Sequence, residues 1–265
     1  IRDRDYGKLR GIAKGARRSK KRFQNVLGLF SHLRLIFFDR EGMGLVRVES
    51  GDLLNPFPHI REDLKRIYYG NYYLELVNEM AGEREAHPEA FDLLLSFLMD
   101  LDQNEPAEEQ LRMFEIRMLS LFGYRPHLIH CGSCQRNWEE LRGAPSLFFS
   151  LEKGTLICER CFKEGERLIP ISLGTARLID QVAQLQLSRL SRLRFTFQAL
   201  VESRAILPRF ITHQLGKELK SLKGLRESFE APHLISASQR DRSATGPNDQ
   251  ISKVQHGEGD QKVEF

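Results

Sequence analysis

The chain has 265 residues, which exceeds the usual size of one domain, so two or three compact units with cores of their own are expected. Hydrophobic residues make up 41% and charged residues 29%, which excludes disorder through most of the length, and no apolar run approaches the ~18 residues that a membrane-spanning helix needs. The net charge of +4 is unevenly distributed, because residues 1–34 carry eleven Lys and Arg against two Asp. A segregated basic segment favours phosphate backbones as partners over anionic membrane surfaces.

The N-terminal part of the chain shows the pattern of β-strands. The basic residues Lys8, Arg10 and Lys14 share one parity and alternate with small or apolar residues, which predicts a strand with one basic face. Farther on, the apolar run Leu33–Phe38, a turn-forming segment and the run Leu45–Glu49 predict a hairpin. We expect these strands to form an antiparallel β-barrel, because so short a sheet needs closure or a covering helix to protect its edges.

Helical periodicity follows and is interrupted once. The first predicted helix begins after Pro58 and presents on one face Ile60, Leu64, Ile67, Leu74, Val77 and Met80. Pro88 and Pro106 open two more helices, since proline is favoured in the first turn. After the interruption, Ser172 is a predicted N-cap, and a further helix is expected from Pro208. The middle of the chain is therefore predicted to be a helical bundle.

These patterns divide the chain into four parts. A β domain is expected over residues 1–55, and a helical domain over residues 56–127 and 166–230, with an insertion over residues 128–165. Residues 231–265 are rich in Ser, Gln, Asp and Gly and lack periodicity, which predicts a disordered tail. The predicted fold class is therefore α+β.

The insertion contains all four cysteines of the chain, as Cys131-Gly-Ser-Cys134 and Cys158-Glu-Arg-Cys161. Two C-x-x-C knuckles supply four thiolates at the spacing of a tetrahedral zinc site, and the stretch between them can form a hairpin. Two disulfides or reactive redox pairs are the alternatives, but a chain of this size does not need such cross-links. A catalytic zinc keeps an open position for water, so four cysteines predict a structural Zn²⁺.

Three other residues lie beside the knuckles in the sequence. His127 and His130 precede the first knuckle, and we expect them at the surface or in contact with the ligands rather than in place of a thiolate. Trp138, the only tryptophan, is expected to pack against the knuckle, with stacking on a nucleobase as the alternative.

The second signal is a run of eight basic residues within fifteen positions. Its glycines let a nucleic-acid backbone approach closely, and we expect its cations to neutralise phosphates: Lys8, Arg10, Lys14, Arg17, Arg18, Lys20, Lys21 and Arg22. A solvated charged loop is the alternative. A weaker cluster is predicted on one side of the final helix, as a solvated face or as a contact for an acidic partner: Lys217, Lys220, Lys223 and Arg226.

Catalytic patterns are nearly absent from the sequence. No H-E-x-x-H, G-x-S-x-G, Walker or G-x-G-x-x-G motif occurs. His87-Pro88-Glu89 is similar to the first half of a zinc deaminase signature, but that signature needs a proline before its C-x-x-C, where this chain has His130 and Ile157. We therefore expect no enzymatic activity.

Three segments together match the pattern of a known family. They are Tyr6–Arg18, Leu121–Pro126 leading into the first knuckle, and Arg209–Lys223, and in order and spacing they cover nearly everything but the tail. On these segments the chain resembles the RecO family of bacterial DNA repair proteins. The resemblance implies an N-terminal OB-fold with DNA contacts in the basic strand, and a helical domain that carries the zinc module. Family members begin with further strand residues before the position of Ile1, so we expect a barrel without its opening strand or two.

The resemblance also implies a function. A protein of this family is a recombination mediator in the cytoplasm, associated with the nucleoid, and has no catalytic turnover. It binds single- and double-stranded DNA, anneals complementary strands and, with RecR, helps load RecA onto DNA coated by single-stranded-DNA-binding protein, whose acidic tail is a candidate partner for the Lys-rich cluster. The alternative is a zinc-ribbon adaptor that binds RNA or a protein partner. No membrane or small-molecule substrate is expected.

Overall fold

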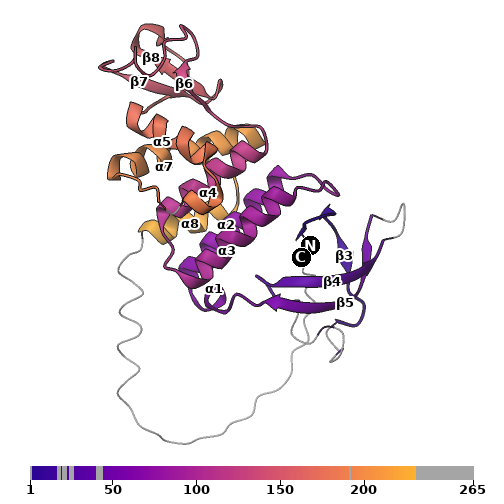
Figure 1. Cartoon of the computed structure of the whole chain (residues 1–265). Helices are drawn as coiled ribbons and strands as arrows, with labels where there is room; N and C mark the ends of the chain where they lie inside the picture. Colours follow the sequence, from indigo (N-terminus) through magenta and orange to yellow (C-terminus); the bar gives the residue numbers. More distant parts are fainter. Residues whose placement is uncertain are drawn as a thin grey trace, which may run out of the picture. The chain divides into compact units, whose positions relative to one another are not determined.

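The computed structural model describes residues 2–16, 19, 23, 27–39, 44–190 and 192–230, the side chains of residues 228–230 excepted. The chain divides into two units, Ile1–Ser228 and Phe229–Phe265. Within the first unit, strands precede helices, and a second sheet lies between two of those helices in the chain (Figure 1). The α+β class is therefore confirmed. None of the helices in the described part is both long enough and apolar enough to cross a membrane.

The N-terminal strands form two small sheets. The strands are β1 (Arg2–Asp3), β2 (Gly7–Lys8), β3 (Gly11–Ile12), β4 (His32–Phe38) and β5 (Val46–Asn55). β1 pairs with β2, and the second sheet has the order β3-β5-β4, in which β4 and β5 are antiparallel. The predicted hairpin is confirmed, although its second strand continues past Glu49 to Asn55.

The larger of these sheets covers a small apolar core. The core consists of Leu9, Phe23, Val46 and Val48, with Ala13, Ala16, Leu35 and Phe37 packed against it. Over the described residues the two sheets are not closed into a barrel, and β3 pairs with β5 in parallel, so the expected closed antiparallel form is not seen. The inner residues of this sheet, Leu35 and Phe37 of β4 and Val46 and Val48 of β5, pack instead into this apolar cluster.

The predicted continuous basic strand is wrong. The carbonyl oxygen of Lys8 accepts a hydrogen bond from the N–H of Arg84 at 3.0 Å, whereas that of Arg10 accepts one from Val46 at 2.8 Å. The backbone therefore changes partner between these two residues, and β2 and β3 belong to different sheets. Alternation in the sequence predicts extended backbone here, but it carries no information about which partner each residue finds.

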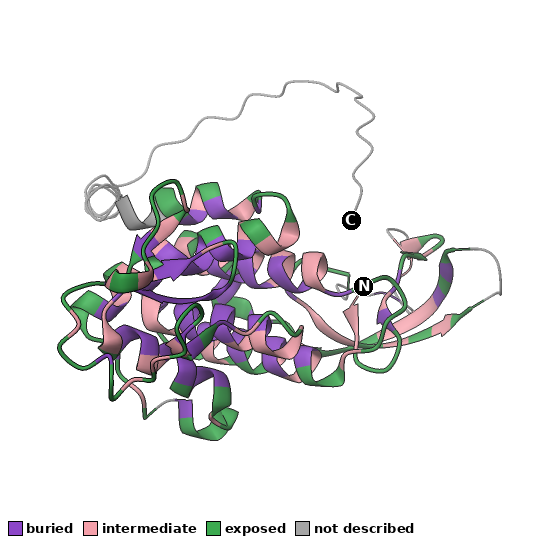
Figure 2. Ribbon diagram, turned by 90° about the horizontal axis from the view of Figure 1, so that it is seen from above, coloured by how far each residue is buried: buried purple, intermediate pink, exposed green. Residues whose placement is uncertain are grey.

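Eight helices follow in the described part of the chain. They are α1 (Pro58–Glu62), α2 (Leu64–Met80), α3 (Pro88–Gln103), α4 (Glu108–Leu121), α5 (Leu173–Gln184), α6 (Leu187–Leu190), α7 (Phe197–Leu215) and α8 (Ser221–Glu230). Figure 2 shows buried residues on the sides where these helices meet and exposed residues on their outer sides. The helical bundle is thus confirmed.

The first predicted helix is two helices, and its predicted face is only partly buried. Asp63 separates α1 from α2 and caps α2, because its side chain accepts a hydrogen bond from the N–H of Arg66 at 2.8 Å. This break shifts the helical phase, so Leu64 is half exposed while Ile60 and Val77 are buried. The core face of α2 is aromatic instead and consists of Tyr69, Tyr72, Tyr73 and Leu76.

The helices opened by Pro88, Pro106 and Ser172 agree with the prediction. α3 begins at Pro88, α4 begins two residues after Pro106, and the Ser172 side chain accepts from the N–H of Thr175 at 3.2 Å to cap α5. The predicted helix start at Pro208 is wrong, because this proline lies inside α7. Burial of that stretch of α7 offsets the hydrogen bond that the proline removes.

The second sheet lies between α4 and α5 in the chain. Its strands are β6 (His127–Cys131), β7 (Leu147–Ser150), β8 (Thr155–Cys158) and β9 (Leu168–Pro170), in the order β6-β8-β7-β9. β6 runs parallel to β8, whereas β7 is antiparallel to both of its neighbours. Each residue of β8 is buried, as expected of the strand between two others.

A buried polar network joins α2 to α4. The hydroxyl of Tyr72 donates to Glu115 Oε1 at 2.5 Å, and Arg112 Nη1 lies 3.0 Å from Glu115 Oε2. Burial raises the pKa of Glu115 to about 7, although the charge of Arg112 and the Tyr72 hydrogen bond lower it. The protonated form of this carboxyl is therefore more favoured near neutral pH than that of an exposed glutamate.

Replacing Glu115 by Gln should flatten the pH dependence of stability. Because the folded-state pKa of about 7 lies above the ordinary 4.5, the contribution of Glu115 to the free energy of unfolding is full below pH 4.5 and is lost as the pH rises through 7. Relative to Glu115→Gln, the wild type should lose on the order of 3 kcal/mol over this interval, as measured by urea unfolding. Glu62→Gln, at the exposed end of α1, should keep the wild-type slope. Equal slopes for wild type and Glu115→Gln would contradict the raised pKa.

Candidate metal centre and basic surface

The first cysteine knuckle is a tight turn at the end of β6. The N–H of Cys131 donates to the carbonyl of Arg136 at 2.8 Å, and the N–H of Gln135 donates back to the Cys131 carbonyl at 2.9 Å. Gln135 has a φ of 61°, the left-handed conformation that lets the chain reverse here. Gly132 is required for close approach, because a Cβ at this position would lie 2.3 Å from the side chain of Thr155.

The second knuckle follows β8, and its place in the sheet brings it to the first. β8 ends at Cys158, and a 3₁₀ turn, η2 (Glu159–Cys161), carries the fourth cysteine. Since β6 and β8 are neighbouring parallel strands, their carboxyl ends lie at the same edge of the sheet. The stretch between the knuckles does form a hairpin, from β7 and β8, but only β8 carries a cysteine, and β6, which carries Cys131, is not an arm of this hairpin.

The four cysteine sulfurs form one cluster. All four are free, and their sulfur atoms lie within 4.8 Å of one another. A tetrahedral site with Zn–S bonds of ~2.3 Å requires sulfurs roughly 3.8 Å apart. The Sγ atoms of Cys134 and Cys158 lie 3.7 Å apart, which fits that requirement and is far from a disulfide bond. The four residues present therefore fit a metal ion held by thiolates, as the spacing predicts.

The cysteines of the cluster differ in pKa. The guanidinium of Arg136 donates from Nη2 to Cys158 Sγ at 2.7 Å and from Nε to Cys134 Sγ at 3.5 Å. Hydrogen bonding from Arg136 lowers the pKa of Cys134 to about 6. Burial, followed by the neighbouring cysteine sulfurs, raises the pKa of Cys161 to about 12. Four thiolates in one cluster therefore need a cation, and a dication supplies the required charge.

The other residues beside the knuckles stay outside the sulfur cluster. His127 is exposed, and the Nδ1 of His130 lies 3.4 Å from the carbonyl oxygen of Cys131. The Trp138 indole N–H donates to the carbonyl of Leu128 at 2.5 Å, and the Arg177 guanidinium of α5 lies 5.2 Å from its ring centroid. Trp138 thus packs between the module and α5, with one ring face occupied by a cation.

The apparent affinity of the chain for zinc should rise with pH. Because the pKa of Cys161 is about 12, a bound dication has to displace at least this proton near neutral pH. Each displaced proton makes the association constant rise about tenfold per pH unit. Competition with a chelating indicator between about pH 6 and pH 8 measures this slope. An affinity that stays constant across that range would contradict binding by thiolates.

The predicted basic run is only partly within the described residues. Lys8 is half-buried, and Arg10 and Lys14 are exposed, whereas Arg17, Arg18, Lys20, Lys21 and Arg22 lie outside the described residues. The Nη2 of Arg10 lies 2.5 Å from Glu83 Oε1, in an ion pair whose two side chains are 67% and 50% exposed. The part of Glu83 in this pair could not be predicted from the sequence, since no local signal connects it to a residue 73 positions away.

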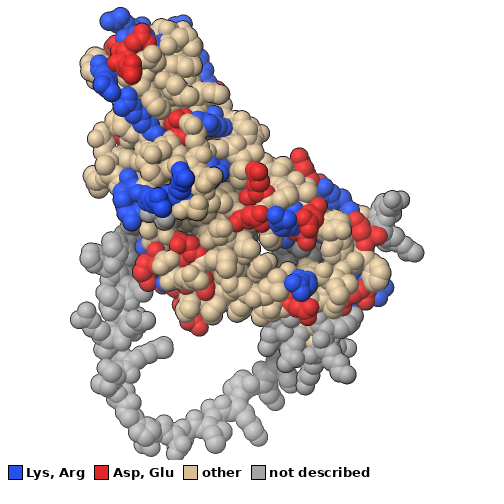
Figure 3. Space-filling view, in the orientation of Figure 1, with Lys and Arg blue, Asp and Glu red and all other residues tan. Residues whose placement is uncertain are grey.

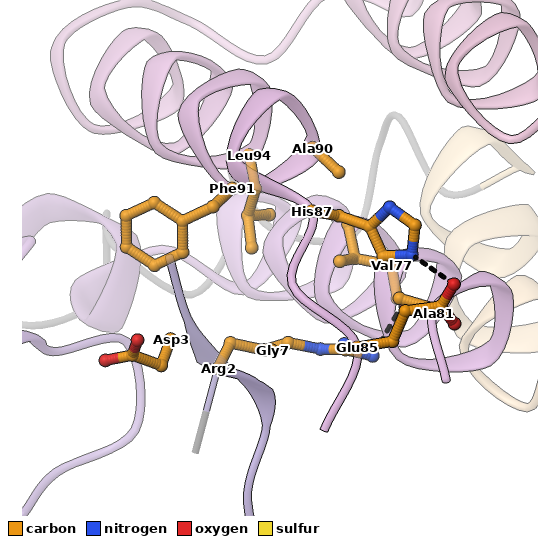
Figure 4. A pocket seen from close by; sticks show the side chains of 10 residues that line it. All are labelled: Arg2, Asp3, Gly7, Val77, Ala81, Glu85, His87, Ala90, Phe91 and Leu94. Atoms are coloured by element: carbon orange, nitrogen blue, oxygen red, sulfur yellow. Dashed lines mark hydrogen bonds and ion pairs between the residues drawn. The ribbon is translucent and has the colours of Figure 1, made fainter. Parts of the chain in front are cut away.

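The strands are joined to the helices by a set of arginine contacts. Arg2 Nη2 donates to the carbonyl of Val77 near the end of α2 at 2.7 Å, and burial lowers the pKa of Arg2 to about 10 (Figure 4). Arg4 makes two hydrogen bonds with Asp92 at 3.0 and 3.1 Å. The connection between α2 and α3 also contacts the strands, because the N–H of Arg84 donates to the Lys8 carbonyl. Gly7 permits this approach, since a Cβ there would lie 2.1 Å from the Glu85 carbonyl oxygen.

Acidic side chains accompany the basic ones at this junction. Figure 3 shows Asp and Glu side chains next to Lys and Arg side chains over the strands and the neighbouring helix ends. Arg84 makes two hydrogen bonds with Asp39, at 2.5 and 3.0 Å. The described part of the basic surface is therefore partly neutralised by the protein itself.

The predicted Lys-rich face on the final helix is wrong. α7 ends at Leu215 with Gly216 in the left-handed conformation, so Lys217 and Lys220 lie in a turn, and Lys223 and Arg226 lie on α8. The Lys217 ammonium lies 2.6 Å from Glu79 Oε2, and Arg226 lies 2.9 Å from Glu218. The apolar spacing of the sequence continues across this turn, and the turn contains no proline. Gly216 is therefore the one local signal that the helix ends here.

Comparison with known proteins supports one family across both parts of the chain. Family models described as recombination protein O, N terminal and C terminal, match residues 4–57 and 61–223. The chain is 38% identical over 226 residues to the DNA repair protein RecO of Syntrophus aciditrophicus, covering 84% of this chain and 86% of that protein. It is 38% identical over 225 residues to the RecO of Syntrophobacter fumaroxidans (85% and 88%) and 32% identical over 229 residues to that of Desulfosudis oleivorans (84% and 87%). The chain therefore belongs to the RecO family of recombination and DNA repair proteins.

Proposed function

We propose that this chain is a non-enzymatic recombination mediator that binds single- and double-stranded DNA and anneals complementary strands. The observation that carries the proposal is the concentration of eight basic residues between Lys8 and Arg22 in a member of the RecO family. Cations at this density bind phosphates through counterion release, without reading bases. Annealing requires only that two backbones be brought together, and no covalent step.

The described contacts are compatible with phosphate binding. The ion pair between Arg10 and Glu83 is exposed on both sides, and exposed pairs contribute only about 0–1 kcal/mol. A phosphate can therefore replace the Glu83 carboxylate at Arg10 at little cost. The metal centre, in contrast, is bound to the helical part, because Trp138 contacts α5 through Arg177. We infer that bound zinc is structural and supports the helical part of the protein.

Family membership also supports a set of protein partners. We propose that the chain acts with RecR to load RecA onto DNA coated by single-stranded-DNA-binding protein. Lys220 and Lys223 are exposed and remain candidates for the acidic tail of that protein. Lys217 and Arg226 already lie beside Glu79 and Glu218, so an acidic tail would have to compete with these carboxylates.

The affinity for single-stranded DNA should fall steeply with salt. For single-stranded DNA, six to eight phosphate contacts predict a loss of about 300- to 2,500-fold in affinity between 50 and 200 mM salt. Fluorescence anisotropy with a labelled oligonucleotide measures this slope, and competition with RNA of the same length tests the RNA-adaptor alternative. A flat salt response would exclude the basic run as the contact, and preferential retention of RNA would favour the adaptor.

Basic-run and cysteine variants should separate DNA binding from stability. Replacing Arg17, Arg18, Lys20 and Lys21 by Ala should lower DNA affinity by at least about 100-fold at low salt with little change in unfolding. Cys131→Ser should lower the free energy of unfolding first, because it removes a ligand of the metal centre. Thermal unfolding and oligonucleotide binding, measured on both variants, test this division. A Cys131→Ser protein that is fully stable yet does not bind DNA would contradict it.

A further inference from the structure

Arg136 contacts both cysteine knuckles. Its guanidinium reaches one sulfur of each knuckle, with Nη2 at 2.7 Å from Cys158 Sγ and Nε at 3.5 Å from Cys134 Sγ. The same Nη2 lies 3.3 Å from Glu159 Oε1, next to Cys158. The Arg136 side chain is 18% exposed, so it lies against the cluster rather than in solvent.

The backbone of the first knuckle sets the position of this side chain. The carbonyl of Arg136 accepts the N–H of Cys131, and Gln135 before it adopts the left-handed conformation. These two features fix the backbone of Arg136 two residues after Cys134, so the side chain starts close to the cluster. The contact of Arg136 with the sulfurs therefore does not depend on the ordering of a long loop.

The negative charge of a metal ion held by four thiolates makes the contact with the Arg136 cation stabilising. A dication held by four thiolates has a net charge of −2, and Cys131 and Cys158 are fully buried, where such charge is costly. Arg136 places a cation at the cluster, while the Glu159 carboxylate that binds Arg136 is itself 3.7 Å from Arg160. N–H groups that donate to thiolates also withdraw electron density from the sulfur lone pairs, which makes the sulfurs less reactive toward electrophiles other than the metal.

We propose that Arg136 is a positioning residue of the metal centre, which links the two knuckles and retards release of the metal by offsetting the charge of Cys134 and Cys158. The planar guanidinium suits this role because it presents several donors in a fixed fork, whereas a lysine ammonium is a single point charge. Partners that orient metal ligands typically contribute 10–100-fold to metal affinity. This proposal concerns the metal centre alone and does not depend on DNA binding.

The test compares full-length zinc-loaded variants. Arg136→Ala should release zinc to excess chelator at least about tenfold faster than wild type, with Arg136→Lys in between. Arg142→Ala is the matched control, since Arg142 is an exposed arginine of the same module with no ion pair among the described residues, and it should release zinc at the wild-type rate. Wild-type release rates in both Arg136→Ala and Arg136→Lys would overturn the proposal.

A second readout separates positioning from a general loss of structure. In cobalt-substituted protein, the sulfur-to-cobalt charge-transfer band should move to lower energy in Arg136→Ala, because the N–H groups that stabilise the sulfur lone pairs are gone. If Arg136→Ala does not fold, Arg136→Gln serves instead, since its amide keeps N–H donors without the charge. It should release zinc faster than wild type with a smaller band shift. A band unchanged in every folded variant would overturn the proposal.

Discussion

The parallel pairing of β6 with β8 is the constraint on which the metal centre depends. Parallel strands end at the same edge of a sheet, so the turn after each strand delivers two sulfurs to one place. β8 lies between β6 and β7, and all four of its residues are buried there. The sulfur cluster, the tight turn at Gly132 and the position of Arg136 all follow from this pairing.

A second constraint connects the N-terminal strands to the helices. Within the described part of the chain, the small apolar core under these strands includes only four buried residues, which is little support for an independent sheet. Contacts from Arg2, Arg4 and Lys8 to the end of α2, the start of α3 and the segment between them supply further support. Several of the same cations belong to the basic end of the chain. Part of the positive charge therefore serves the fold.

The sequence predicted correctly those elements whose ends are fixed by residues a few positions away. The cysteine spacing, the hairpin of β4 and β5, and the helix starts at Pro88 and Ser172 are such cases, because caps, turns and knuckles involve residues a few positions apart. The aromatic face of α2, the interior Pro208 and the salt bridge between Arg10 and Glu83 were not predictable, since each depends on packing or charge from distant residues. Arg136 was visible two positions after Cys134, but its contact with Cys158 required the sheet.

The paired cations also change how the basic character of this chain should be interpreted. A count over the sequence treats every Lys and Arg near the N-terminus as available to phosphate, yet Arg4 binds Asp92 and Arg10 binds Glu83. The two kinds of pair differ in strength, because Arg4 makes two hydrogen bonds with its carboxylate and Arg10 forms a single exposed contact. A phosphate therefore displaces Glu83 more readily than Asp92. It follows that, of these two arginines, Arg10 is the one through which DNA binding would loosen the contact between the strands and the helices.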